Sequence, residues 1–345
     1  MSNKLKAIVL SKNYEGYRSG YYHQDLINAL KNNMDVFIYG PGYDGYDEND
    51  NISDVISKSA FDIKDVFAIF ASTSWDDDTS DSNVDPHPKI ELSEVKNIKK
   101  IYFLNKEYKK LNARFEYCKK NKFDVVFTVH PNANKWAEEE GINIKQLHFG
   151  IDLDRFKYQG EKKKIDFAFT GSLHRGHLDY RFNVKKEIFK ESRLNTKSNL
   201  NWMSLFGSSI KDNYCKYNIY WAEFGARDIL FKSLIPFDKE YGAFLKKTKM
   251  VLNTPSAVGI FNTRFFELMA SKTLILCPRV NAYDGILKDG INCLMYNPDM
   301  SDFHNVFSKG LNDEVLRNSI TEKAFEDVSE HSYDARVLYI LSELC

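Results

Sequence analysis

Short apolar runs alternate with helix-length segments along the first half of the chain. KAIVL at 6–10, VFAIFAS at 66–72 and DVVFTV at 124–129 read as buried strands, and the segment 23–32 has helical spacing. Parallel strands need long crossover connections, which are usually helices, so this alternation favours a parallel sheet covered on both faces. It predicts an α/β, doubly wound fold. Further strands are expected at 36–39, 100–105 and 146–151.

The alternation restarts after residue 153, and IDFAFTG at 165–171 reads as a new first strand. Because 345 residues exceed what one hydrophobic core usually serves, we predict two Rossmann-like domains facing a cleft. The expected divisions are an N-terminal domain at 1–153, a C-terminal domain at 154–328, and a last helix at 329–345 that packs back towards the N-terminal domain. The expected elements of the second domain are strands at 202–206, 227–231, 249–253, 273–277 and 293–296 and helices at 238–247 and 262–271.

Charge and cysteine content exclude several classes of protein. Lys plus Arg equals Asp plus Glu at 48 each, so no net field draws nucleic acid, and any anion site must be local. The five cysteines are scattered without a C-x-x-C pair, which argues against a disulfide framework or a zinc site. No signal peptide or membrane-spanning stretch is found. We expect a cytoplasmic protein, with the basic stretch 96–122 leaving open a peripheral association with the inner face of the membrane.

Polar residues follow the first strand of the second domain. Gly171, Ser172 and Arg175 come directly after IDFAFT. A glycine at such a turn lets backbone N–H groups approach a phosphate, and an arginine adds charge-assisted hydrogen bonds. Glycine is also common in strand-to-helix turns that bind nothing, so this turn alone does not establish a site.

A second polar group surrounds the start of the predicted helix at 262–271. The strand before it ends at Thr254, and Asn262 or Thr263 is placed to cap the helix. Arg264 adds positive charge to the positive end of the helix dipole, which favours an anion, and Glu267 is placed to accept hydrogen bonds from hydroxyl groups such as those of a ribose. An ordinary surface pair between Arg264 and Glu267 explains the same spacing.

Several segments, taken in order, resemble the donor region of GT-B glycosyltransferases, in particular the bacterial "glycosyl transferases group 1" type related to CgeB-like proteins. RFFELMA at 264–270 resembles the family's R-x-F-E-x-x-A helix, KDGINCL at 288–294 its D-G-x-x-x-L turn, and HSYDAR at 331–336 its terminal H-[ST]-Y-x-x-R helix. The segments 124–156 and 165–189 resemble the end of the first domain and the opening of the donor domain.

This resemblance implies an enzyme that moves a sugar from a nucleotide-diphosphate sugar to a cell-surface glycan or related acceptor, which is a glycan, lipid-linked or protein molecule. It implies that Glu267 binds the ribose, that Arg175 and Arg264 lie near the diphosphate, and that no metal or other cofactor is needed. Many retaining relatives carry another glutamate eight positions earlier, where this chain has Gly259. Retention and inversion of the sugar configuration therefore both remain open.

An inverting reaction needs a base in the N-terminal half. His87 is held between two prolines and follows Asp85, whereas His130 directly follows a predicted strand. Both histidines and Asp85 are candidates, although a plain loop histidine and a structural or acceptor-contact role fit equally well. Tyr17 and Tyr21 are candidate acceptor contacts, since aromatic rings stack on sugars, although a turn with surface tyrosines gives the same pattern.

The run Asp76 to Asp78 contains an Asp-x-Asp that would suit a manganese site, but its surroundings are rich in Asp, Ser and Thr. An exposed acidic loop is the better interpretation, and no metal is expected. Two other functions stay open. One is transfer of a phosphate-linked group on the same fold, as in building capsule or teichoic-type polymers, and the other is a non-catalytic nucleotide-sugar-binding subunit, which Gly259 suggests.

Overall fold

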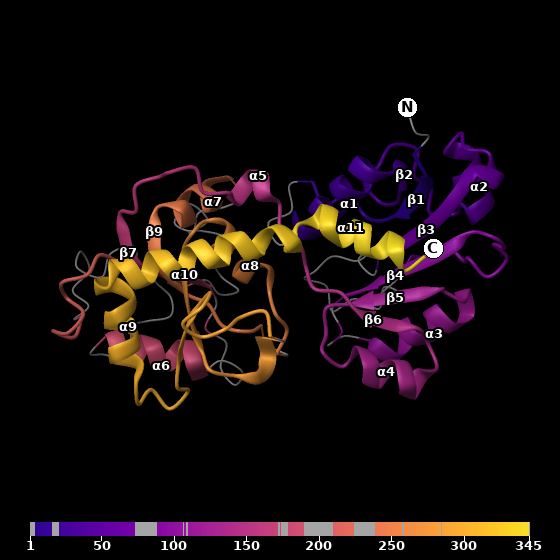
Figure 1. The fold of residues 1–345 in the computed structure, drawn as a ribbon. Helices are drawn as coiled ribbons and strands as arrows, with labels where there is room; N and C mark the ends of the chain where they lie inside the picture. The colour runs from indigo at the N-terminus through magenta and orange to yellow at the C-terminus, as the bar shows by residue number, and fades with distance from the viewer. Residues whose placement is uncertain are drawn as a thin grey trace. The chain divides into compact units, whose positions relative to one another are not determined.

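A computed structural model gives the structure of the chain (Figure 1). It describes residues 4–15, 21–72, 88–105, 107, 110–171, 173, 179–189, 210–223, 239–256, 259–283 and 285–344. The chain forms two compact units, an N-terminal unit of Met1–Gly150 with Tyr333–Cys345 and a C-terminal unit of Ile151–Ser332. The sequence had suggested divisions after residues 153 and 328. No helix in the described part of the chain is long and apolar enough to cross a membrane.

The N-terminal unit contains a six-stranded parallel sheet in the order β2-β1-β3-β4-β5-β6. Because β1 lies between β2 and β3, the winding direction reverses there, and the crevice between the carboxyl ends of β1 and β3 is the switch point. The strands are β1 (Lys6–Leu10), β2 (Asp35–Tyr39), β3 (Val66–Ser72), β4 (Lys99–Leu104), β5 (Val125–Thr128) and β6 (Ile144–Gln146).

Side chains of β1 alternate between two buried faces. Ile8 and Leu10 pack into one apolar cluster, whereas Ala7 and Val9 pack into another that includes residues of α1 and α11. This burial on both sides explains why β1 is a continuous apolar run. The helices of the unit are α1 (Tyr21–Asn33), α2 (Ile52–Lys58), α3 (Leu111–Asn121), α4 (Ala133–Glu140) and α11 (Tyr333–Ser342), together with the 3-10 helix η1 (Ile63–Asp65).

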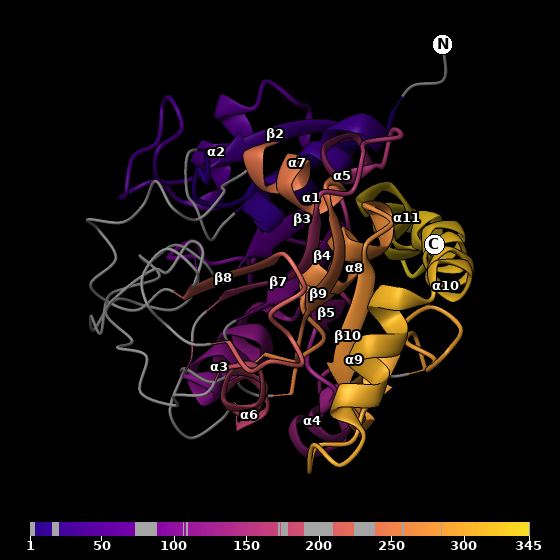
Figure 2. The ribbon, with the colours of Figure 1, turned by 90° about the vertical axis from the view of Figure 1, so that its left-hand side faces the viewer.

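The C-terminal unit contains a five-stranded parallel sheet in the order β11-β10-β9-β7-β8 (Figure 2). Here the first strand, β7, lies between β8 and β9, so the switch point falls at the carboxyl ends of β7 and β9. The two parallel sheets confirm the predicted doubly wound α/β class. The strands are β7 (Ile165–Gly171), β8 (Ile219–Glu223), β9 (Thr248–Leu252), β10 (Leu274–Pro278) and β11 (Leu294–Tyr296).

Helices cover both faces of this second sheet. Residues of α6 and α9 share one apolar cluster, and residues of α7 and α8 share the other. The helices are α5 (Leu153–Phe156), α6 (Asp179–Ile188), α7 (Lys239–Lys246), α8 (Thr263–Ala270), α9 (Phe303–Asn312) and α10 (Glu314–Asp327), with the 3-10 helices η4 (Asn281–Tyr283) and η5 (Val328–His331).

Three strand predictions differ from the structure or lie beyond it. The run 146–151 was expected to be a strand, but β6 ends at Gln146 and the rest of the run leaves the sheet. The edge strand β8 was not predicted. The strands expected at 202–206 and 227–231 lie outside the described residues.

Gly242 allows α7 to pack against α5. A Cβ atom at this position would lie 2.6 Å from the main-chain oxygen of Arg155, a distance that requires the backbone to move. We expect Gly242→Ala to lower the free energy of unfolding by about 1–3 kcal/mol, as overpacking generally does. Urea unfolding measures this, with the exposed neighbour Glu240→Ala as control. Equal stability of Gly242→Ala and the parent protein would contradict the close contact.

Candidate functional site

Buried polar groups meet at the switch point of the C-terminal unit. Thr170 and Gly171 end β7, and Asn253 and Thr254 directly follow β9. All four are buried. Ligands of doubly wound folds bind beyond the carboxyl ends of the strands at such a point, so these residues mark the expected place of a site.

Arg264 lies in the first turn of α8 and contacts the end of β7. Its Nη1 donates a hydrogen bond to the main-chain oxygen of Thr170. Its guanidinium carbon lies 5.5 Å from the ring centroid of Tyr241 on α7, within the range of a cation–π interaction. Strand, ring and helix together fix the position of this positive charge.

Arg181 brings a second positive charge to the same place from α6. Its Nε donates to Thr254 Oγ1 over 2.7 Å, and the residue is only 9% exposed. A Cβ atom on Gly171 would lie 3.5 Å from Arg181 Nη1, so the guanidinium lies directly against that glycine. Burial, reinforced by the charge of Arg264, lowers the pKa of Arg181 to about 10. Two guanidinium groups close enough to repel each other form a local concentration of positive charge.

Asn262 precedes α8 at the N-cap position, but within the described structure its side chain does not cap the helix. Its Nδ2 donates to the main-chain oxygen of Thr254 over 2.8 Å, and its Oδ1 accepts from Asn253 Nδ2 over 3.1 Å. The sequence had proposed a cap from Asn262 or Thr263. Since no acidic residue lies in the first turn either, the positive potential of this helix end adds to that of Arg264.

Glu267 lies one turn after Arg264 and is 1% exposed. This burial rules out a surface Arg–Glu pair on the outer face of α8, which was the alternative interpretation of the spacing. Burial raises the pKa of the neighbouring Tyr241 hydroxyl. The positive charge of Arg264 lowers this pKa, and the negative charge of Glu267 raises it, so both groups act on the same hydroxyl. The carboxylate therefore belongs to the same polar group, named here the arginine site: Arg181, Arg264, Glu267, Thr170 and Thr254.

Gly259, eight positions before Glu267, has a φ of +76° and open space around its Cβ position. Its N–H donates to the main-chain oxygen of Ser256 over 3.0 Å in a tight turn. Left-handed backbone explains a glycine here without reference to function. We expect Gly259→Ala to lower the free energy of unfolding by about 1 kcal/mol, measured by urea unfolding. Gly160→Ala, at a φ of +97° with equally open surroundings, should cost a similar amount, and no loss at Gly259 would contradict the assigned turn.

The structure does not place the remaining predicted site residues in the arginine site. Asp85, His87, Tyr17, Ser172 and Arg175 lie outside the described residues, as does the run Asp76 to Asp78. The structure describes no group of three or more His, Cys, Asp or Glu side chains that suits a metal ion.

His130 and Tyr21 are described in the N-terminal unit. His130 follows β5, and its ring packs at a tilt against Trp136 of α4 with 4.5 Å between the ring centroids. Its Nδ1 accepts a hydrogen bond from the N–H of Asn132 over 3.1 Å. Burial lowers the pKa of His130. These contacts hold the start of α4. Tyr21 is the first residue of α1 and meets Tyr22 edge to face at 6.4 Å.

The sequence reasoning missed Arg181. The sequence feature that could have identified it is the spacing of Arg181, Val184 and Ile188. This spacing places the arginine on the same face of α6 as two fully buried apolar residues. A charged residue on a buried helix face needs a polar partner, and Thr254 is that partner.

Comparisons with known proteins agree with this architecture. Residues 187–342, from the end of α6 through α11, match the family model described as "Glycosyl transferase-like". No curated protein matches the chain. Among solved structures, a glycosyltransferase from Rickettsia africae is 13% identical with a TM-score of 0.58, covering 99% of this chain and 98% of that one.

Two further structures extend over both units. HepE from Anabaena, solved in complex with UDP-glucose, is 10% identical with a TM-score of 0.52 and covers 98% of this chain and 99% of that one. Sucrose-phosphate synthase from Thermosynechococcus elongatus is 11% identical with a TM-score of 0.53, covering 98% of both chains. At these identities the structures show the fold alone, and the family match covers residues 187–342. The chain therefore has the GT-B fold of these glycosyltransferases, and its segment from α6 to α11 matches the glycosyl transferase-like family model.

Proposed function

We propose that the chain transfers a sugar from a nucleotide-diphosphate sugar to an acceptor hydroxyl, and that the arginine site binds the diphosphate. The observation that carries this proposal is the convergence of Arg181, Arg264 and the uncapped end of α8 at one switch point. In the reaction the bond between the anomeric carbon and the diphosphate oxygen breaks, and its electron pair stays on the diphosphate. The acceptor oxygen forms the new bond to carbon and loses its proton.

The arginine site suits this reaction because negative charge grows on the leaving diphosphate. Arg264 is already held by Thr170 and Tyr241, and Arg181 by Thr254, so little reorganisation is needed when the charge develops. Removing one such donor from an enzyme typically lowers the rate by about 10²–10³-fold. Arg181 is buried and Arg264 is partly buried, which strengthens their effect because less water screens them.

Glu267 is the proposed ligand of the ribose. Its buried carboxylate accepts hydrogen bonds only, and the two ribose hydroxyls are donors. The UDP-glucose bound by HepE, which has the same fold, supports a uridine nucleotide as the first donor to test. The resemblance to bacterial group 1 enzymes supports a role in polysaccharide assembly, with a glycan, lipid-linked or protein acceptor met in the cytoplasm or at the inner face of the membrane.

Titration with nucleotides tests the donor site directly. We expect one of UDP, GDP, ADP and CDP to bind in the micromolar range, about −8 kcal/mol, and CMP to bind more weakly because it lacks the second phosphate. Isothermal calorimetry on the full chain gives these affinities. Equal affinity for the diphosphate that binds and for the monophosphate of the same base, or no binding by any diphosphate, would contradict a site built for the diphosphate.

We also propose that turnover needs no divalent metal, because the two arginines and the end of α8 supply the charge that offsets the diphosphate. We expect the release of nucleoside diphosphate to proceed at the same rate in EDTA and in added Mg²⁺ or Mn²⁺. A rate lost in EDTA and restored by either ion would show that a metal takes part.

A further inference from the structure

Tyr296 is the last residue of β11, at the carboxyl edge of the sheet in the C-terminal unit. Its main-chain oxygen accepts a hydrogen bond from the N–H of Arg279 over 2.8 Å, and its ring meets Phe303 of α9 edge to face at 5.1 Å. The residue has no exposed surface. Strand pairing and ring packing therefore hold the phenol in one position.

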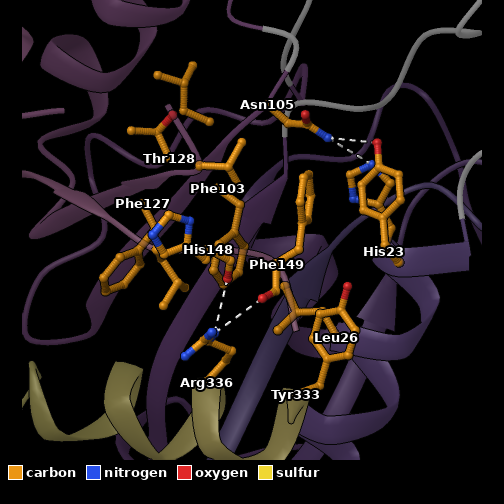
Figure 3. Close-up of a pocket in the computed structure, with 14 residues that line it drawn as sticks. His23, Leu26, Phe103, Asn105, Phe127, Thr128, His148, Phe149, Tyr333 and Arg336 are labelled. Atoms are coloured by element: carbon orange, nitrogen blue, oxygen red, sulfur yellow. Dashed lines mark hydrogen bonds between the residues drawn. The ribbon is translucent and has the colours of Figure 1, made fainter. Parts of the chain in front are cut away.

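The hydroxyl of Tyr296 has no hydrogen-bond partner among the described residues. Buried polar groups are usually bonded to a neighbour. A pocket of the N-terminal unit gives an example, since Arg336 there donates through Nε to the main-chain oxygens of His148 and Phe149 over 3.1 and 3.3 Å (Figure 3). A buried hydroxyl that bonds nothing destabilises the fold, and a polar group of a bound ligand would satisfy it.

This hydroxyl lies near the arginine site, on the face of the sheet that α6 covers. Tyr296 shares an apolar cluster with Phe169 of β7, and the guanidinium carbon of Arg181 lies 5.8 Å from the centroid of the Phe169 ring. Arg181 lowers the pKa of Tyr296, and Tyr296 raises the pKa of Arg181, so the two groups are within electrostatic reach of each other. Arg181 and Thr254 are buried as well, so the hydroxyl is enclosed to a similar degree as its neighbours in the site.

The protonation state of the hydroxyl makes it a hydrogen-bond donor. Burial raises the pKa of Tyr296 well above its ordinary value, so the phenol keeps its proton at neutral pH. A neutral O–H group that donates to an anionic oxygen makes a charge-assisted hydrogen bond, which is stronger than one to a neutral acceptor. The positive charge of Arg181 attracts such an anion to the same place, whereas it offers nothing to a neutral ligand. A phosphate oxygen is therefore the acceptor that these two groups favour together.

We propose that Tyr296 is a diphosphate-binding residue, whose hydroxyl donates a hydrogen bond to a phosphate oxygen that Arg181 also contacts. The assignment rests on the proposed function, because it takes the diphosphate to be bound at Arg181. It gives a reason for a tyrosine in a core position that phenylalanine would fill equally well. The bound nucleotide supplies the acceptor that the described part of the chain does not.

Tyr296→Phe tests the assignment, since it removes the hydroxyl and keeps the ring. By calorimetry on the full chain, with the nucleoside diphosphate that the parent protein binds, we expect Kd to rise at least about fivefold, because a hydrogen bond to a charged group is lost. The urea midpoint of unfolding without nucleotide should stay the same or rise, because an unbonded buried hydroxyl is removed. In an Arg181→Met background the same substitution should raise Kd less, since both groups are proposed to bind one phosphate.

Tyr102→Phe is the matched control. Tyr102 of β4 lies in the N-terminal unit, is fully buried, and likewise has a hydroxyl without a hydrogen-bond partner in the part of the chain that the structure describes. Its substitution should affect unfolding as Tyr296→Phe does and leave Kd unchanged.

The outcomes separate this inference from the proposed function. If the parent protein binds a nucleoside diphosphate and Tyr296→Phe raises Kd by less than expected, or no more than Tyr102→Phe does, the assignment of Tyr296 is wrong and the diphosphate site stands. A lower urea midpoint in Tyr296→Phe would also overturn it, because the hydroxyl would then be bonded within the protein or to a buried water. If the parent protein binds no nucleoside diphosphate, the proposed function itself fails.

Discussion

Arg181→Met is expected to lower nucleoside diphosphate affinity by about 10–150-fold while leaving the C-terminal unit as stable as before or more stable. The loss corresponds to about 1.5–3 kcal/mol, the usual contribution of a hydrogen bond to a charged group. The stability follows from burial, because the guanidinium is 9% exposed and lies close enough to Arg264 to be repelled. Replacing a buried charge with a well-packed apolar side chain is often neutral or stabilising by about 1–4 kcal/mol.

Calorimetry and urea unfolding measure the two halves of this prediction on the same sample. Thr254 keeps a hydrogen-bond partner in the variant, since its hydroxyl also donates to the main-chain oxygen of Pro255 over 3.3 Å. Lys186→Met removes one positive charge from the exposed side of the same helix and should change neither quantity. A variant that binds diphosphate as the parent does, or that loses both binding and stability, would show that Arg181 serves the fold and not the ligand.

Glu267→Gln is expected to weaken diphosphate binding by a similar amount, about 1.5–3 kcal/mol, because the amide replaces a charged acceptor of ribose hydrogen bonds. Glutamine keeps the size of the side chain, which matters at a position that is 1% exposed. Glu267→Ala should weaken binding at least as much.

A deoxynucleotide shows whether the ribose is what Glu267 binds. The parent protein should lose affinity when a 2′-deoxy or 3′-deoxy diphosphate replaces the ribonucleotide, and Glu267→Gln should lose less. This comparison isolates the coupling between one carboxylate and one hydroxyl. If the variant and the parent lose the same fraction of affinity for both deoxynucleotides, Glu267 does not contact the ribose.

The sequence predicted the central strands well, together with the edge strands β2 and β11, but it misplaced or missed the other two edge strands, β6 and β8. β1, β7 and β9 are central strands buried on both faces, so they appear as continuous apolar runs. β6 and β8 are edge strands of their sheets, where short and mixed sequences are favoured. The apolar run 146–151 was assigned to a strand, but its residues Leu147, His148 and Phe149 line a pocket of the N-terminal unit instead.

The arginine site was predicted in part. Thr254, Arg264 and Glu267 could be connected because the strand end and the helix start that carry them are close in sequence, and the resemblance reinforced that grouping. Arg181 could not be connected to them, since its contact with Thr254 spans 73 positions and depends on how α6 packs on the sheet.

The nucleotide released during turnover tests the central claim most directly. The full chain is incubated separately with UDP-glucose, GDP-mannose and CDP-glycerol in the presence of the methyl glycosides of glucose, galactose and N-acetylglucosamine as acceptors, and ³¹P NMR identifies the product. Glycosyl transfer breaks the bond between the sugar and the diphosphate, so we predict that the parent protein releases a nucleoside diphosphate from a sugar donor. We expect this release to be lost in Arg181→Met. Release of CMP from CDP-glycerol would instead show transfer of a phosphate-linked group, and binding of a nucleotide sugar with no release of any nucleotide would show a non-catalytic subunit. Either result would contradict the account.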